Sequence, residues 1–483
     1  MDFEPRGLPE LKFEELPEIP GIWIDFVNSK LSFLPAPREM KTLREIADAV
    51  RSQERKREKL SQVLACSEIL DPAQMESAQR LLHPESVAIV TNIYPSLLGG
   101  PVSQILKCLT VVKVCEELAK DGILSVPVCW ISTTAPLGFS ARSVSMLDDE
   151  SELHRLQLSD ATDLAPGELV PSDQASALLH QIEEFGRGTY DTEILEILRG
   201  ALAPATPFPS PLARLVTALM KEWGLIVLDA GVPDIKKLLD ETLAPIRGRT
   251  KEILSRMEKP VSGLGAPGNV GSSSEDSVPA CLIPSLVLPA IAWVIDSHEI
   301  NEYAKALPIL DAALVPRPAA WPRSSVTILD VRSRRNLERY NLSLARLYSG
   351  EEEAIKKIME ALPDSTSGKL KNLRLEVETR MSELATMASA GSELADSAKS
   401  CGEKITYQLE KLQLQFAAAM QRKEQAVRRH IHKACNFLAP NQRTQEMELA
   451  GIQIPLRFSR GGLRSLYEKL DVMKLEHQLI GMD

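Results

Sequence analysis

The sequence predicts an α/β fold, with a core of parallel strands and helices and a helical arm toward the C-terminus. Three observations favour it. Short apolar runs rich in β-branched residues alternate with helical segments up to about residue 330, which is typical of parallel sheets. Long helical runs with few prolines and glycines follow. Apolar residues make up 44% of the chain and charged residues 25%, as in an ordinary globular protein.

The first strand, helix and second strand follow one another after Pro84. Ser86–Val90 is a short apolar run, so we expect a buried strand there. The apolar segment Pro101–Lys120 is long enough for a helix, and Gly122 fits its C-terminal stop. Val126–Ser132 predicts a second buried strand. This order predicts a right-handed βαβ unit with parallel strands, and therefore a Rossmann-like core.

Further strands and inserted helical elements complete the predicted core. Leu225–Asp229 and Ser325–Leu329 are apolar runs that predict two more strands. The segment 261–277 is rich in Gly and Ser and predicts a flexible loop. The remaining expectations, in chain order, are an extended stretch over residues 1–36, a helical pattern from about Glu39 to Leu70, helices over Ala175–Phe185, Glu193–Leu202 and Leu212–Trp223, and an apolar stretch followed by a polar helix within Ile283–Ala304.

The later part of the chain predicts an arm of two antiparallel helices. Positions seven residues apart, from Val377 to Leu412, form a weak heptad-like seam. A turn over Ala388–Gly391, with Ser392 as the N-cap of the next helix, predicts a hairpin rather than one continuous helix. Such a seam has no partner in a monomeric core, so it predicts a homodimer formed through this coiled-coil arm. The predicted domains are a core over residues 1–336, the arm over 337–436, and a segment over 437–483 that returns to the core.

Composition argues against several classes of protein. The net charge of −10 and the pI near 5.5 disfavour a general nucleic-acid-binding protein. They also disfavour a protein that binds anionic membranes, since both kinds of binding need a basic surface. The sequence contains no run of about 18 apolar residues that could cross a membrane, and the N-terminus has no apolar signal region.

The seven cysteines are scattered, without CxxC or zinc-ligand spacing. They predict reduced thiols in a cytoplasmic protein and no metal site.

Two features could form a ligand site. Asp229 ends a predicted strand, where open parallel sheets bind their ligands, although a strand-end cap or a salt bridge explains it equally well. Gly99 and Gly100 lie before Pro101 at the start of a predicted helix, where backbone N–H groups could hold a carboxylate or a phosphate. The alternative is an ordinary tight turn, which the spacing alone favours.

Taken in order, these segments resemble the enzymes that add cysteine in bacillithiol biosynthesis. That family has a strand ending in Thr-Gly-Gln-Gln, a Gly-Gly-Pro or Thr-Gly-Pro turn, a helix bearing a Lys, and a strand ending near Phe-Trp. Four further blocks follow in the family's order: EWGLIVLDA (222–230), LVLPAIAWVIDSHEINEYAKALPIL (286–310), PRSSVTILD (322–330) and NFLAPNQRTQEME (436–448). The resemblance covers roughly residues 60–455. The residues that match the first group are Thr91, Gly99, Gly100, Pro101, Lys107, Pro127 and Trp130.

The resemblance implies an activity and a set of site residues. The reaction would join the carboxyl group of cysteine to the amine of glucosaminyl malate, with ATP as the activating co-substrate. The sequence has no GxxxxGK[ST] motif to locate the nucleotide, and no metal or prosthetic group is implied. The family also implies a homodimer through the helical arm. The implied residues are Asp229 and Glu299 as catalytic carboxylates, Thr91, Gly99, Gly100, Trp130, His298 and Arg323 for substrate, and Arg428 and Arg429 for a nucleotide phosphate.

Structural alternatives exist for several of these residues. Arg323 could clamp a substrate carboxylate or make an internal ion pair, which is commoner. His298 and Glu299 could instead begin a helix, and the basic cluster around Arg428 could be a solvated coiled-coil face. We expect the pocket to lie at the C-terminal ends of the strands, lined by Thr91, Gly99, Gly100, Trp130, Asp229 and Glu299.

Three departures from the family pattern leave other functional hypotheses open beside the cysteine-adding ligase. Asn92-Ile93-Tyr94 replaces Gly-Gln-Gln, and Thr133–Pro136 replaces an acidic, His-containing segment. Ile295–Glu299 replaces Gly-Gly-Pro-Gly-Glu and keeps only its Glu. General acid–base chemistry needs a titratable group near the substrate. The chain is therefore either a cysteine-adding ligase, a binding or scaffolding relative without catalysis, or a ligase for another substrate.

Overall fold

The computed structural model describes most of the chain in two compact units. One unit comprises Met1–Val331 and Asn436–Asp483, and the other comprises Arg332–Cys435. The described residues are 11–31, 34, 37–52, 60–61, 64, 71–133, 142–158, 172–203, 209–256, 282–360, 365–388 and 392–482.

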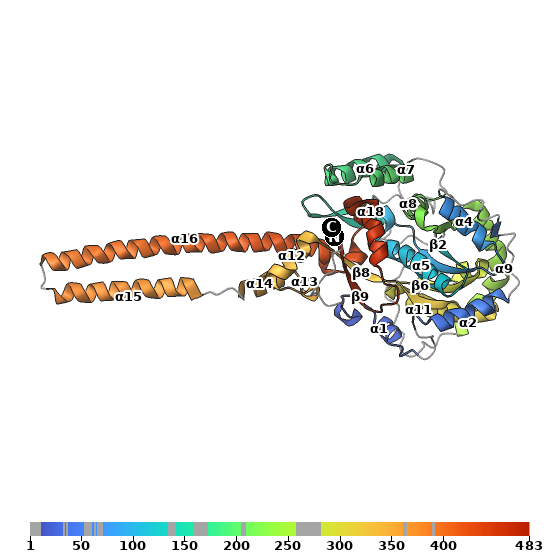
Figure 1. Cartoon of the computed structure of the whole chain (residues 1–483), viewed down its shortest axis with the longest axis horizontal. Helices are drawn as coiled ribbons and strands as arrows, with labels where there is room; N and C mark the ends of the chain where they lie inside the picture. Colours follow the sequence, from blue (N-terminus) through green and yellow to red (C-terminus); the bar gives the residue numbers. More distant parts are fainter. Residues whose placement is uncertain are drawn as a thin grey trace. The chain divides into compact units, whose positions relative to one another are not determined.

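A five-stranded parallel sheet forms the centre of the first unit. Its strand order is β5-β2-β1-β6-β7, and every strand pair in it is parallel. The sheet residues are buried, as expected for parallel strands covered on both faces. The Rossmann-like α/β core is therefore confirmed, with helices around the strands (Figure 1). The strands are β1 (Val87–Ile93), β2 (Ser125–Ile131), β5 (Ile226–Asp229), β6 (Ala290–Ile295) and β7 (Ala319–Pro322).

The βαβ unit predicted from the sequence connects β1 to β2 through α5 (Val102–Lys120). This helix is apolar around most of its circumference because it packs on β1 and β2 and is covered by α17 and α18 (Gln445–Glu448 and Gln453–Lys469). Gly122 has φ +74°, a left-handed conformation that favours glycine and ends the helix as predicted.

The C-terminal segment, Asn436–Asp483, belongs to the first unit. The expected strand over 325–329 is present as β8 (Ser325–Asp330), but it pairs in parallel with β9 (His477–Met482) in a separate two-stranded sheet.

The other described helices of this unit are η1 (Phe13–Glu15), α1 (Gly21–Val27), α2 (Met40–Arg51), α4 (Pro72–Leu81), η2 (Leu97–Gly99), α6 (Ser172–Gly186), α7 (Thr192–Leu202), α8 (Pro211–Met220), η4 (Lys221–Trp223), α9 (Pro233–Arg256), α10 (Leu282–Val287), η5 (Ser297–Glu299), α11 (Ile300–Ala312) and η6 (Pro440–Gln442).

One expectation needs correction, and two regions contain strands that the sequence analysis did not assign. The stretch over 1–36 is not wholly extended, because α1 forms where Trp23 and Phe26, three residues apart, both bury their rings. The region after residue 137 contains a hairpin, β3 (Ser143–Leu147) with β4 (Leu153–Gln157), which its polar residues concealed. The apolar stretch before the polar helix contains strand β6. The flexible loop over 261–277, and most of the helical pattern beyond residue 52, lie outside the described residues.

The second unit contains the predicted antiparallel hairpin. Helices α15 (Ser365–Met387) and α16 (Glu393–Leu438) run side by side (Figure 1). Arg374 pairs with Glu410 at 3.0 Å, and Gly402 lies against Met381, which fixes the antiparallel register. The Ser392 hydroxyl accepts from the Ala395 N–H at 3.3 Å, so Ser392 caps α16 as predicted. The shorter helices of the unit are α12 (Val331–Tyr340), α13 (Leu344–Leu347) and α14 (Glu351–Glu360).

The arm exposes apolar side chains of its seam in the single chain. Leu384 is 53% exposed and Leu394 is 74% exposed. We expect a dimer through this surface, because exposed apolar patches of this kind mark interfaces. The double substitution Leu384→Glu and Leu394→Glu should convert the dimer to a monomer in sedimentation at micromolar concentration, whereas the control Lys399→Glu should not. An unmodified chain that sediments as a monomer would contradict the prediction.

Candidate functional site

Asp229 ends β5 and is held by protein groups. Its Oδ1 accepts from the Thr133 hydroxyl at 2.6 Å and from the Gly231 N–H at 2.9 Å. Its Oδ2 accepts from the Ser210 N–H at 2.8 Å. The residue is 3% exposed. This geometry is that of a strand-end cap which ties together the loops after β2 and β5 and the start of α8.

The Gly99–Gly100 turn packs against the C-terminal segment. The two glycines have φ +84° and +64°, and a Cβ on Gly100 would lie 2.4 Å from the Ser96 hydroxyl. The Gly451 N–H donates to Gly100 O at 2.6 Å. The Val102 N–H, which a helix start could offer to an anion, donates instead to Leu449 O at 2.9 Å. The glycines are therefore explained by a tight turn, the interpretation that the spacing favoured.

Thr91 and Trp130 lie inside the sheet near the strand ends. The Thr91 hydroxyl donates to Val294 O at 3.0 Å and so joins β1 to β6. Trp130 is fully buried and pairs in register with Asn92 on β1. Asn92 Oδ1 accepts from the Ser132 hydroxyl at 2.6 Å. Asn92, at the position where the family pattern has Gly, thus uses its amide oxygen to hold the loop after β2.

Glu299 forms a buried ion pair with Lys107 of α5. Lys107 Nζ donates to Glu299 Oε1 at 2.7 Å and to Asn92 O at 2.6 Å. Glu299 Oε2 accepts from the Asp296 N–H at 2.7 Å. Burial raises the pKa of the Glu299 carboxyl group, although Lys107 acts against this shift. The pair connects the helix after β1 to the loop after β6.

Arg323 follows β7 and binds two buried carboxylates. Its Nε donates to Asp296 Oδ2 at 2.6 Å, and its two Nη groups donate to both oxygens of Glu446 at 2.8 and 2.9 Å. Burial alone would raise the pKa of Asp296, but the charge and hydrogen bond of Arg323 hold it at about 2. The guanidinium clamp expected from the sequence is present, and it holds protein carboxylates, as the ion-pair alternative predicts.

The charged network continues to residues that the sequence reasoning did not single out. Glu446 also accepts from the Ser325 hydroxyl at 2.6 Å and the Val326 N–H at 2.7 Å. Ser325 in turn contacts His477 Nδ1 at 2.7 Å, and Thr327 contacts His477 Nε2 at 2.8 Å. The only signal for Glu446 was the Gln-Glu pair of the block over 436–448, and no local pattern indicated His477.

His477 gives the fold a dependence on pH. Burial lowers the pKa of its imidazole to about 4, from a usual value of 6.5, so the folded protein holds it neutral. The stability that the neutral His477 imidazole contributes to the folded state is therefore fully present above pH 6.5 and is lost as the pH falls toward 4. Between pH 7 and pH 5 we expect the free energy of unfolding to fall by about 2 kcal/mol through this residue. Urea unfolding at both pH values should show a smaller fall in His477→Gln; an equal fall would contradict the assignment.

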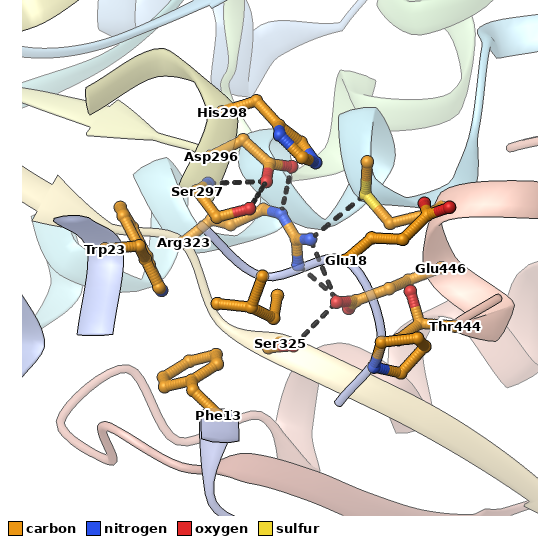
Figure 2. Close-up of a pocket in the computed structure, with 13 residues that line it drawn as sticks. Phe13, Glu18, Trp23, Asp296, Ser297, His298, Arg323, Ser325, Thr444 and Glu446 are labelled. Atoms are coloured by element: carbon orange, nitrogen blue, oxygen red, sulfur yellow. Dashed lines mark hydrogen bonds and ion pairs between the residues drawn. The ribbon is translucent and has the colours of Figure 1, made fainter. Parts of the chain in front are cut away.

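A pocket lies at the carboxyl ends of β6 and β7, and the N-terminal segment contributes Phe13, Glu18 and Trp23 to its lining (Figure 2). Exposed His298 stands at its rim above Asp296, and Glu446 lies on the opposite side from Trp23. The lining includes Phe13, Trp23, Asp296, His298, Arg323 and Glu446.

Of the predicted site residues, the pocket brings together His298 and Arg323. Thr91, Gly99, Gly100, Trp130, Asp229 and Glu299 are not among its lining residues. Strands β2 and β1 lie between β5 and β6. At about 4.8 Å per strand, the ends of β5 and β6 are roughly 14 Å apart, so Asp229 and Glu299 cannot hold the same ligand atom.

The basic cluster of the second unit is paired with glutamates. Arg428 donates from Nε to Glu424 at 3.1 Å and from Nη1 to Glu352 at 2.8 Å. Beside Arg429, the His430 ring contacts the Tyr340 hydroxyl through Nδ1 at 2.7 Å. These contacts fit the charged coiled-coil face, and phosphate binding by Arg428 and Arg429 stays a prediction.

Within the described residues, no group of three or more His, Cys, Asp or Glu side chains could hold a metal ion. No described helix is both long and apolar enough to span a bilayer. Among the residues that the structure describes, five cysteines are free thiols, namely Cys108, Cys115, Cys129, Cys401 and Cys435.

Comparison with known proteins gives a consistent assignment for both parts of the chain. Residues 28–267 match the family model "Bacillithiol biosynthesis BshC, N-terminal Rossmann-like domain", and residues 326–482 match "Bacillithiol biosynthesis BshC, C-terminal coiled-coil domain". Curated relatives named "Putative cysteine ligase BshC" include a protein of Solibacter usitatus, 21% identical over 88% of this chain and 90% of its own length. Another, from Salinibacter ruber, is 22% identical over 86% of each chain. The chain therefore belongs to the BshC family of bacillithiol biosynthesis.

Proposed function

We propose that this chain is a ligase that joins L-cysteine to glucosaminyl malate through an amide bond. The observation that carries the proposal is a pocket at the carboxyl ends of β6 and β7 whose lining includes Asp296, His298 and Arg323, in a chain that belongs to the BshC family. Relatives with the cysteine ligase name align over most of their length. Open parallel sheets bind their ligands at this edge.

The chemistry requires activation of the cysteine carboxyl group. We assign that role to ATP, which would convert the carboxylate to an acyl phosphate with release of ADP, or to an acyl adenylate with release of pyrophosphate. The amine nitrogen of glucosaminyl malate would then attack the acyl carbon, and phosphate or AMP would leave. The nitrogen must also lose a proton. His298 is the exposed imidazole of the pocket, and imidazole is the side chain best suited to accept a proton near neutral pH.

The buried charges beside the pocket would then position the site. Arg323 connects Asp296, after β6, to Glu446 in α17. Lys107 connects α5 to Glu299 in the same loop as His298. Both ion pairs are internal, so we propose that they hold the loop over residues 296–299 in place. We propose that His298 alone contacts the substrate.

The proposal is tested by incubating the purified chain with cysteine, glucosaminyl malate and ATP, and following the amide product by mass spectrometry. Omission of each reactant in turn is the control. Product that requires all three supports the ligase. Product that forms without ATP would contradict the assigned activation, and product with another amine would identify a different substrate.

A second function, a binding or scaffolding subunit without catalysis, is favoured by one observation. The carboxylates of Asp229 and Glu299, which the family resemblance implies for catalysis, are both occupied by protein donors. Such a relative would bind the substrates and form no product.

The role of Asp229 can be tested separately. In Asp229→Asn, an amide NH₂ group replaces one carboxylate oxygen, so a backbone N–H that now donates to Asp229 loses its acceptor. We therefore expect the free energy of unfolding to fall by about 1–3 kcal/mol. Urea unfolding measures this loss, with the exposed Asp234→Asn as the control. An unchanged stability together with lost ligand binding would instead support direct contact with substrate.

A further inference from the structure

The pocket beside His298 is too small for the substrate that we propose. Its cavity volume is about 20 Å³, which is room for an ordered water molecule and not for a sugar ring. Strands β6 and β7 beside it are buried and paired in parallel, so they cannot separate without breaking the sheet. Another part of the wall must therefore move before the substrate can enter.

One wall of the pocket comes from a segment near the N-terminus that lies outside the strands. We call residues 11–30 the lid segment, which contains η1 and α1. Figure 2 shows Trp23 of this segment and Thr444, the N-cap residue of α17, on opposite sides of the pocket. The lid segment lines the pocket with Phe13, Pro17, Glu18, Ile19 and Trp23. Its displacement would open the pocket and leave the sheet intact.

The lid segment has contacts of its own that would hold it together as it moves. The Phe13 and Trp23 rings pack edge to face with their centroids 6.1 Å apart, and those of Trp23 and Phe26 are 5.7 Å apart. The Asn28 side-chain amide donates to Glu14 Oε1 at 3.2 Å. All these contacts lie within residues 11–30, so none of them is lost if the segment moves as one body.

Few polar contacts join the lid segment to the rest of the described chain. The backbones of Leu11 and His477 exchange two hydrogen bonds, at 3.2 and 2.9 Å. Arg443 Nε donates to Glu18 Oε2 at 2.8 Å. These two side chains are 38% and 58% exposed, and exposed ion pairs contribute little to stability.

Two buried polar atoms at this boundary have no hydrogen-bond partner among the described residues. They are Nε1 of Trp23 and Oγ1 of Thr444, in residues that are 1% and 3% exposed. A buried polar group without a partner costs free energy, and water would satisfy both atoms in an opened pocket. Opening therefore recovers part of what it loses, which favours a local movement at low free energy.

We propose that the lid segment opens as one body to admit substrate to His298, and that this structure shows it closed. The identity of the substrate rests on the proposed function, whereas the opening itself is a property of the fold. Closure also has a chemical purpose. Water would hydrolyse an activated cysteine carboxyl group, and a closed lid excludes water from the reaction.

The opening is measured without any substrate, by alkylation of a thiol placed beneath the lid. Thr444→Cys is treated with iodoacetamide, and each cysteine is followed by peptide mass spectrometry. Buried Cys129 in β2 reports global unfolding and exposed Cys401 reports a free thiol. We expect the thiol at position 444 to react at least about tenfold faster than Cys129 and at least about tenfold more slowly than Cys401. A rate equal to that of Cys129 would show that the segment does not open, and a rate equal to that of Cys401 that it is not closed.

A second variant weakens the lid contact. Glu18→Ala, added to Thr444→Cys, should raise the alkylation rate at position 444 about twofold, because it removes the ion pair with Arg443. The control is Glu196→Ala, an exposed glutamate on α7 that pairs with Arg199, which should leave that rate unchanged. If Thr444→Cys fails to fold, hydrogen exchange at the Leu11 N–H of the unmodified chain decides. Exchange faster than in β1 supports the lid, and equal exchange refutes it.

The need for opening during turnover is tested by fastening the lid. Glu18→Cys with Arg443→Cys is joined by a short bismaleimide, and each single variant receives the same reagent as its control. The joined chain should lose at least about tenfold of the turnover that it had before treatment, and the single variants should not. Full turnover in the joined chain would contradict the lid. Absence of turnover in every form would refute the proposed ligase, and the alkylation rates would still decide whether the lid opens.

Discussion

Arg323→Met is expected to lower the free energy of unfolding by about 3–5 kcal/mol, since it leaves two carboxylates buried without their counter-ion. The side chains of Arg323, Asp296 and Glu446 are 5%, 10% and 3% exposed. Little bulk water therefore reaches the two carboxylates. Urea unfolding at pH 7 measures the effect.

An exposed arginine of similar geometry provides the control. Arg317 donates from Nε to Asp311 at 2.7 Å, but both side chains are 48% exposed. Because exposed ion pairs contribute little, Arg317→Met should change stability by less than about 1 kcal/mol. Adding Glu446→Gln to Arg323→Met should recover part of the loss by removing one unpaired charge. Equal effects of Arg323→Met and Arg317→Met would show that the buried network does not stabilise the fold.

The second large effect concerns turnover. His298→Ala is expected to lower kcat by about 100-fold or more, the usual contribution of a positioned general base. His298 is exposed, so the melting temperature should change little. The matched control is His180→Ala, an exposed histidine on α6 that lies beside Glu184 and is not among the lining residues. A rate that stays within about twofold of the unmodified chain would exclude His298 as the base.

Much of the parallel sheet could be predicted from local sequence because its strands are buried on both faces. The segments that became β1, β2 and β5 are short apolar runs with little ambiguity. Strand β7 was missed because it is four residues long and ends in Pro322. Proline is tolerated there because β7 is an edge strand.

The candidate site was harder to predict because its parts come from distant segments. Arg323 was singled out from its residue type, but its partner Glu446 lies 123 residues further along the chain. Trp23 belongs to a segment that was expected to be extended, so nothing placed it beside a pocket. Sequence patterns indicate strands and helix ends, whereas the pairing of buried charges depends on tertiary packing. For the same reason, the role of Asp229 as a strand-end cap could not be separated from a catalytic role.

The central claim is tested most directly by counting amide product per chain. Purified protein, incubated with cysteine, glucosaminyl malate and ATP, should form many molecules of product per chain, with consumption of ATP in a fixed ratio to product. This count separates a ligase from a binding subunit, because binding alone gives none. Multiple turnovers in the unmodified chain, greatly reduced in His298→Ala, are the result that we predict. Tight binding of the substrates without any product, in a folded protein, would contradict the ligase and support the non-catalytic function.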